Sequence, residues 1–284
     1  MSSSAKPKTA ATRDVPPTAG DAAPAHPPST TSVSAGDRPQ AESKVRSSQT
    51  STKSTATGGA NARANAGPDS RRRLLNAAGK LIAARGLEEG VSLREITRAA
   101  GQKNTTALQY HFGDREGMLR ALVQLHMPRV SVRRNALLDH LLTRGDVTLR
   151  EGAAVLVTPF IAELAQEGGR DFLQVSAQLV NRSDALVDPK DALGALVYDP
   201  EHSMDRWSTL IEELMPPRTA GPPLHRRFAA LRFALIELGR RARVGGDHGG
   251  ELFAAQLIDL VAAVLGADLS PETKRIMDER GPHT

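Results

Sequence analysis

Apolar residues recur every three or four positions through most of the chain after residue 70, which is the period of an amphipathic α-helix. The first such run covers about 70–85 and ends at Gly86. Its apolar face is formed by Leu74, Leu75, Ala78, Leu81 and Ile82. No strand-like alternation and no repeat at a fixed period interrupt this pattern. The sequence therefore predicts an all-α protein.

Two shorter helices are expected next. Ser92 and Glu95 have the spacing of a capping box, in which each side chain satisfies a free backbone donor of the other. Gly101 then breaks the helix, and a short polar helix follows from about Asn104 to Phe112. Longer helical stretches are expected near 115–143, 149–167, 170–182, 204–215, 223–243 and 250–265, with a last short helix after Ser270.

A helix, a glycine-containing turn and a short polar helix form a helix-turn-helix, whose second helix enters the major groove of DNA. Leu108 and Phe112 would face the core, which leaves short hydrogen-bonding side chains on the other face. Glutamine can pair with adenine, and threonine can meet a thymine methyl. An ordinary solvated helix face is the alternative. The candidate DNA-binding residues are Arg72, Ser92, Lys103, Asn104, Thr105, Thr106, Gln109, Tyr110, His111 and Arg115.

The charge divides the chain into three parts. Residues 1–69 contain no Leu, Ile, Phe, Trp or Tyr, so we expect a disordered tail, either a weakly basic arm for DNA or a passive extension. Residues 70–120 carry ten Lys and Arg against five Asp and Glu, whereas residues 121–284 carry nineteen against twenty-two. This asymmetry favours a polyanion as the partner of 70–120.

Three arginines, Arg71 to Arg73, are expected in the first turn of the first helix. Cations there oppose the helix dipole, which favours a role in phosphate or minor-groove contact. The alternative is that the flanking Asp69 and Ser70 make arginine tolerable at these positions.

Several other chemistries are disfavoured. The absence of cysteine excludes disulfides, thiolate zinc sites and cysteine nucleophiles. The eight histidines are scattered, the acidic loop 181–203 is expected to be solvated, and no phosphate-binding or nucleophile motif occurs. We therefore expect no cofactor, no metal and no enzymatic activity. No segment approaches the roughly 20 apolar residues of a membrane span, so a cytoplasmic protein without a membrane partner is expected.

Residues 121–284 are expected to form a helical domain that binds a small, apolar effector and pairs with a second copy. Two successive helices are apolar nearly all round, which favours a two-fold four-helix bundle over packing within one subunit. The predicted dimer interface comprises Phe228, Leu231, Leu235, Phe253, Leu257, Leu260, Val261 and Val264. The predicted ligand pocket, each member of which could instead be plain core, comprises Phe160, Phe172, Val175, Leu179, Trp207 and Leu210.

The stretch from Arg72 to Leu122 resembles the DNA-binding domain of TetR-like transcriptional regulators. The matching motifs are "LLNAAGKLIAARG", "VSLREITRAAG" and "YHFGDREGMLRAL". The resemblance implies a homodimeric regulator, commonly a repressor, that binds a palindromic operator and releases it when a small molecule binds. It also implies that Ser92, Tyr110, His111 and Arg115 hold the DNA backbone, and that Thr105, Thr106 and Gln109 face bases.

One departure from the family pattern lies between Gly101 and Tyr110, where the chain is one residue longer than usual. The apolar residue that usually follows the glycine is replaced by Gln102 or Lys103, and Asn104 is either a helix cap or a base reader. Two other classes of function remain open, an enzyme built on a helical bundle and an interaction protein with a decayed DNA-binding head.

Overall fold

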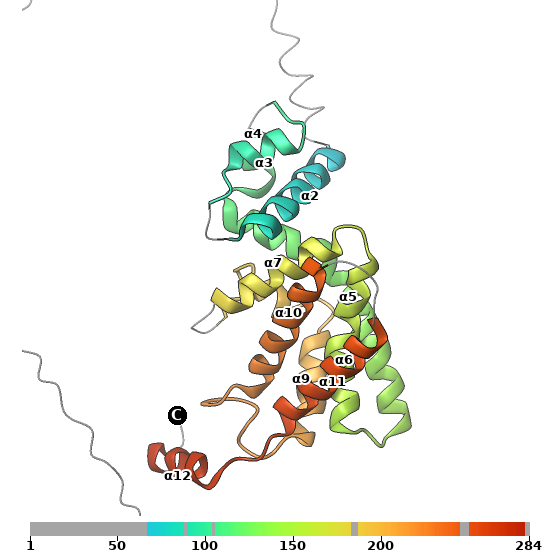
Figure 1. Cartoon of the computed structure of the whole chain (residues 1–284), viewed down its shortest axis with the longest axis vertical. Helices are drawn as coiled ribbons and strands as arrows, with labels where there is room; N and C mark the ends of the chain where they lie inside the picture. Colours follow the sequence, from blue (N-terminus) through green and yellow to red (C-terminus); the bar gives the residue numbers. More distant parts are fainter. Residues whose placement is uncertain (1–66, 88–89, 104–105, 183–186, 245–249, 282–284) are drawn as a thin grey trace, which may run out of the picture. The chain divides into compact units, whose positions relative to one another are not determined.

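The structure is a computed structural model that describes residues 67–87, 90–103, 106–182, 187–244 and 250–281 (Figure 1). Every regular element in these ranges is a helix, as the sequence predicts. The tail expected to be disordered, 1–69, lies outside the described residues except for its last three positions. The described residues all belong to one compact unit, Lys53–Thr284.

Three helices form an N-terminal head, α2 (Pro68–Arg85), α3 (Leu93–Ala99) and α4 (Thr106–Phe112). Proline occupies the first turn of α2, where its missing N–H costs no hydrogen bond, and Asp69 in that turn complements the dipole. The prediction that Arg71 to Arg73 lie in the first turn was partly wrong, because α2 begins at Pro68, which leaves Arg71 at the end of that turn and Arg72 and Arg73 beyond it. The dipole argument therefore applies to Arg71 alone.

A long helix, α5 (Arg115–Arg144), follows the head and packs on helices of the body. Asp114 caps it, because its Oδ1 accepts a hydrogen bond of 2.7 Å from the N–H of Gly117. The predicted domain boundary between residues 120 and 121 lies within this continuous helix, and the division into 70–120 and 121–284 stays a prediction.

The body contains α6 (Leu149–Ile161), the 3₁₀ turn η1 (Ala162–Ala165), α7 (Gly169–Arg182), α8 (Gly194–Val197), α9 (Ser203–Leu214), α10 (Arg226–Val244), α11 (Gly250–Gly266) and α12 (Pro271–Arg280). Helix α5 packs on α6, α7, α8 and α9. Helix α10 packs on α7 and on α11, and α11 packs on α6 (Figure 1). Gly239 allows the close approach of α10 to α7, since a Cβ there would lie 2.5 Å from the Cβ of Ala177. The short helix α8 was not expected from the sequence.

The core is rich in leucine and valine, with a few large side chains at its centre. Trp207 is 1% exposed, and its indole N–H donates a hydrogen bond of 2.8 Å to the carbonyl of Gly152. That bond joins α9 to α6 and satisfies the only polar atom of the ring. Among the described residues, no single helix is long and apolar enough to cross a membrane, although the bent pair α11 and α12 passes that test together.

Candidate functional site

The short helix α4 presents a polar surface to solvent because its two apolar residues hold it to the head. Leu108 is fully buried and Phe112 is 8% exposed. Thr106, Gln109 and Tyr110 are exposed on the other side, and the Tyr110 side chain is 76% accessible. Exposure of a large aromatic ring beside a glutamine and a threonine is the arrangement that can contact bases and backbone in a DNA groove.

Helix α3 begins with the predicted capping box. The Ser92 Oγ accepts a hydrogen bond from the N–H of Glu95 over 3.2 Å, and the Glu95 carboxylate accepts one from the N–H of Ser92 over 2.9 Å. Arg85 pairs with the same carboxylate at 2.6 Å. The hydrogen bond from Arg85, together with those from Ser92, lowers the pKa of Glu95 to about 2. The start of α3 is therefore tied to the end of α2.

The turn between α3 and α4 accommodates the unusual polar residue after the glycine. Gln102 is 8% exposed and donates a hydrogen bond of 3.0 Å from Nε2 to the Oγ of Ser70, which is 1% exposed. A buried amide of this kind costs stability unless it is hydrogen-bonded. Ser70 supplies the partner, so a glutamine can fill a position that an apolar side chain would otherwise occupy. Lys103, the next residue, is exposed.

Five further DNA-binding candidates lie in the segment from Arg72 to Arg115. Both of these arginines have partners within the protein, two candidates lie outside the described residues, and one is partly buried. Arg115 is half-buried and donates a hydrogen bond of 2.5 Å to the carbonyl of Leu87, so it braces the loop after α2. Arg72 is exposed and lies 3.4 Å from Glu167. Asn104 and Thr105 fall outside the described residues, and His111 is partly buried. The contacts of all these residues with DNA stay a prediction.

The arginine before Arg72 has a structural contact as well. The guanidinium carbon of Arg71 lies 5.3 Å from the centre of the Phe112 ring, which is cation–π geometry. This contact joins the first turns of α2 to the end of α4 and supports the position of the exposed α4 surface.

The head is joined to the body by a side chain that sequence reasoning missed. Gln178 on α7 accepts a hydrogen bond of 2.6 Å from the N–H of Leu87, and its Nε2 donates to the carbonyl of Ile82 over 3.4 Å. Both backbone groups belong to the end of α2 and the loop that follows. A single glutamine of the body therefore caps a helix of the head. Gly79 on α2 permits close packing of that helix on α5, since a Cβ there would lie 3.0 Å from the Leu122 side chain.

A buried ionic cluster lies in the body next to this junction. Glu163 is fully buried and accepts hydrogen bonds from Arg129 and Arg133, and its carboxylate lies 2.9 Å from the Nδ1 of His126. Burial alone would raise the pKa of Glu163, but the hydrogen bonds from His126 and Arg129 outweigh it and hold the pKa at about 2. The three partners lie on successive turns of α5, so the cluster fixes η1 to that helix.

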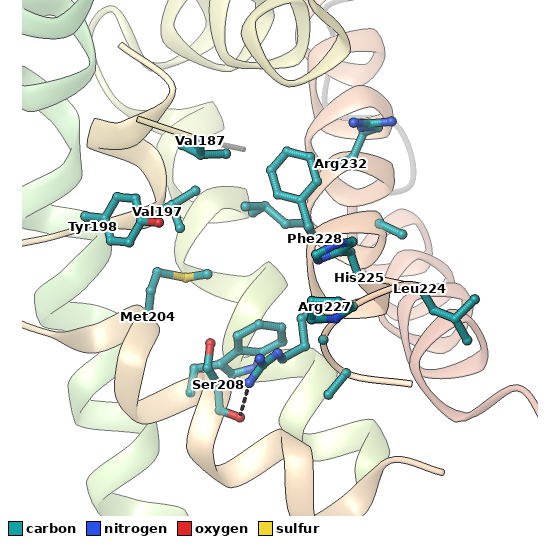
Figure 2. Close-up of a pocket in the computed structure, with 16 residues that line it drawn as sticks. Val187, Val197, Tyr198, Met204, Ser208, Leu224, His225, Arg227, Phe228 and Arg232 are labelled. Carbon is teal, nitrogen blue, oxygen red and sulfur yellow. Dashed lines mark hydrogen bonds between the residues drawn. The ribbon is translucent and has the colours of Figure 1, made fainter. Parts of the chain in front are cut away.

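The body contains a cavity of about 650 Å³ between the segment before α9 and the start of α10 (Figure 2). Val187, Val197 and Tyr198 lie across it from Phe228 and Arg232. The other described lining residues are Met204, Trp207, Ser208, Ala220, Gly221, Pro222, Leu224, His225, Arg227, Ala229 and Leu231. Its size lies in the range of small-molecule sites.

Only Trp207 among the predicted pocket residues lines this cavity. Phe160, Phe172 and Val175 are fully buried in the core, Leu179 is 5% exposed, and Leu210 packs against the core from its edge. The sequence pattern identified large buried apolar residues correctly and could not distinguish those that pack from those that border a cavity. The loop 216–225, which supplies much of the lining, carried no signal that we recognised.

The predicted dimer-interface residues divide into two groups. Leu231, Leu235, Leu257 and Val261 are at most 2% exposed, so they belong to the core of the single chain. Phe228, Phe253 and Val264 are partly buried, and Leu260 is 44% exposed. The helices leave further large apolar side chains on their outer surface: Ile236, Val244 and Leu252.

A scan against models of known protein families and a search of curated proteins find no match to this sequence. Among solved structures, one that resembles the chain is native NalD of Pseudomonas aeruginosa, described as the secondary repressor of the MexAB-OprM multidrug efflux pump. The two share 20% identity over 70% of this chain and 97% of that one, with a TM-score of 0.42. Another is a putative TetR-family transcriptional regulator from a Rhodococcus species, at 18% identity over 70% and 99% of the two chains, with a TM-score of 0.39.

Proposed function

We propose that this protein is a sequence-specific DNA-binding transcriptional regulator of the TetR type. The observation that carries the proposal is the α4 surface, where Thr106, Gln109 and Tyr110 are exposed while Leu108 and Phe112 anchor the helix. The basic character of residues 70–120 also supports DNA as the partner, because a polyanion is attracted to a positively charged module. The resemblance of residues 72–122 to TetR-like heads adds to this support.

The regulator acts as a homodimer in this proposal. Leu252 and Leu260 on α11, together with Ile236 and Val244 on α10, are exposed apolar side chains on two packed helices. Pairing of this surface with a second copy would remove them from water and place two heads on one DNA duplex. Two heads fit a palindromic operator with half-sites one helical turn, or a multiple of it, apart.

A small molecule in the body controls DNA binding in this proposal, and the protein acts as a repressor that the ligand releases. Two connections lead from the body to the head: α5, which carries the buried Leu119 and Leu122 and the partly buried Leu125, and Gln178 on α7. A ligand shifts the balance between two states only by its difference in affinity for them. Through these two connections, a change of state in the body would be transmitted to α4.

The proposal is tested by selection of bound sequences from a random duplex DNA library, with the purified full-length chain at about 0.15 M salt. A regulator of this kind enriches a palindromic site, and Tyr110→Ala fails to enrich it. If no site is enriched, and if all duplexes are retained equally and are released by added salt, charge alone attracts the DNA. The helical-bundle enzyme or the interaction protein would then be the better account of the chain.

A further inference from the structure

The cavity in the body has a chemical asymmetry that the proposed function does not use. One wall is apolar and is formed by Val187, Val197 and Met204, and Trp207 also lines the cavity. The opposite wall is formed by His225 and the first turns of α10, and it carries three basic side chains: His225, Arg227 and Arg232. None of the lining residues that the structure describes is acidic.

The basic side chains are held in place by contacts with the protein. Arg227 donates a hydrogen bond to the carbonyl of Ser208 and pairs with Glu212 at 2.8 Å, and its side chain is 28% exposed (Figure 2). Arg232 lies with its guanidinium carbon 5.0 Å from the centre of the Phe228 ring. Both of these Arg227 hydrogen bonds come from Nη1, and a guanidinium has five N–H groups in a fixed plane, so Arg227 has further donors for a carboxylate.

The backbone adds to the positive character of that wall. Helix α10 begins at Arg226 with no acidic residue in its first turn, so no carboxylate of that turn compensates the positive end of its dipole. Arg227, Phe228 and Ala229 of this first turn all line the cavity. An anionic group in the cavity would therefore meet both the guanidinium groups and the helix terminus.

We infer that the cavity binds an amphipathic carboxylate, a molecule with an apolar body and one anionic head. The body would lie against Val197, Met204 and Trp207, and the head would lie at the start of α10 near Arg227. Such a ligand differs from the simply apolar effector that the sequence predicts. The regulatory meaning of such a ligand rests on the proposed function, whereas its binding does not.

The test uses three probes with the same alkyl chain and different heads: decanoate, decanol and decyltrimethylammonium, each below its micelle concentration. Trp207 is the only tryptophan of the sequence and borders the cavity, so its fluorescence reports on this cavity alone when the tyrosines are not excited. Decanoate is expected to change this fluorescence saturably and to bind about tenfold or more tightly than decanol, since one charge-assisted contact is worth at least that factor.

The variant Arg227→Gln/Arg232→Gln is expected to bind decanoate no more tightly than decanol, while Arg275→Gln on α12 keeps the wild-type preference. Thermal melts of each variant confirm that it is folded. Equal binding of decanoate and decanol by wild type, preference for the ammonium probe, or no fluorescence change with any probe would overturn the inference. DNA selection on the same preparations separates the two proposals. A failure to bind DNA leaves the preference for decanoate unaffected, and a failure to prefer decanoate leaves DNA binding unaffected.

Discussion

The amide of Gln102 donates a hydrogen bond of 3.0 Å to the hydroxyl of Ser70 inside the three-helix head. The bond connects the turn before α4 to the first turn of α2, and both side chains are buried. It holds Gln102 in place after α3, although this side chain is polar. The orientation of α4, and with it the candidate DNA surface, therefore depends on a pair of residues separated by 32 positions.

Because both partners are buried, we expect the two residues to be strongly coupled. Ser70→Ala leaves the Gln102 amide without its partner and should lower the free energy of unfolding by about 1–3 kcal/mol. The double variant Ser70→Ala/Gln102→Leu should lose much less stability, because both polar groups are then removed together. Urea denaturation of the two single variants and the double variant measures this coupling. A double variant whose loss equals the sum of the two single losses would show that the bond contributes nothing.

The buried carboxylate of Glu163 should make stability depend on acid pH. Its pKa falls from 4.5 to about 2 in the folded chain, so its contribution to stability is complete above about pH 4.5 and is lost as the pH falls toward 2. A shift of this size corresponds to about 3 kcal/mol at most. Glu163→Gln should be less stable at neutral pH, because Arg129 and Arg133 lose their partner, and its stability should fall less between about pH 5 and pH 3.

The measurement for Glu163 is urea denaturation followed by circular dichroism at a series of pH values. Glu279→Gln on α12 is the control, since that carboxylate is exposed and pairs only with Arg275 in the described structure. The control should follow the wild-type pH dependence. If the stability of Glu163→Gln has the same pH dependence as that of wild type, the Glu163 cluster is not the source of the acid sensitivity.

Gln178 should protect the backbone of the head from solvent exchange. In wild type the N–H of Leu87 is hydrogen-bonded to the Gln178 side chain over 2.6 Å, so its amide hydrogen is expected to exchange slowly. Gln178→Met removes the acceptor with little change in volume, and exchange in the peptide that contains Leu87 should become faster. Gln174→Met, one turn earlier on α7, is the matched control. Equal exchange in all three proteins would mean that α7 does not hold the head.

The exposed apolar surface of α10 and α11 should determine the oligomeric state. Leu252 and Leu260 are 74% and 44% exposed, so aspartate at either position adds little strain to a single chain. Leu252→Asp/Leu260→Asp should give a folded monomer by analytical ultracentrifugation, while the wild type sediments as a dimer. Asp268→Ala, in the loop after α11, should remain dimeric. A dimeric Leu252→Asp/Leu260→Asp variant would place the interface elsewhere.

The helices and their ends could be predicted because their signals are local. The capping box of Ser92 and Glu95, the cap at Ser270 and the apolar pair Leu108 and Phe112 all depend on residues within about one or two turns of each other. The structure confirms each of these. The start of α2 was misplaced because Pro68 and Asp69 were assigned to the tail.

The connections between distant segments could not be predicted in the same way. Glu163 and Gln178 resemble any polar residue of a helical stretch, and only the packing of α5, α7 and α2 gives them partners. The cavity depends on the loop after Met215 and the start of α10, which meet α9 only in the folded chain. Pocket residues chosen by size and hydrophobicity were therefore mostly core residues.

The central claim, that the α4 surface reads DNA sequence, is tested most directly by the affinities of two glutamine variants for the selected site. Gln109→Ala removes an exposed side chain of α4, and Gln124→Ala removes an exposed side chain of α5. We expect Gln109→Ala to lose about tenfold or more in affinity for the selected site, because a bidentate contact with a base is worth about 1–3 kcal/mol. Its affinity for scrambled DNA should not change, and Gln124→Ala should match wild type on both. Equal affinity of wild type and Gln109→Ala for the selected site would contradict the claim.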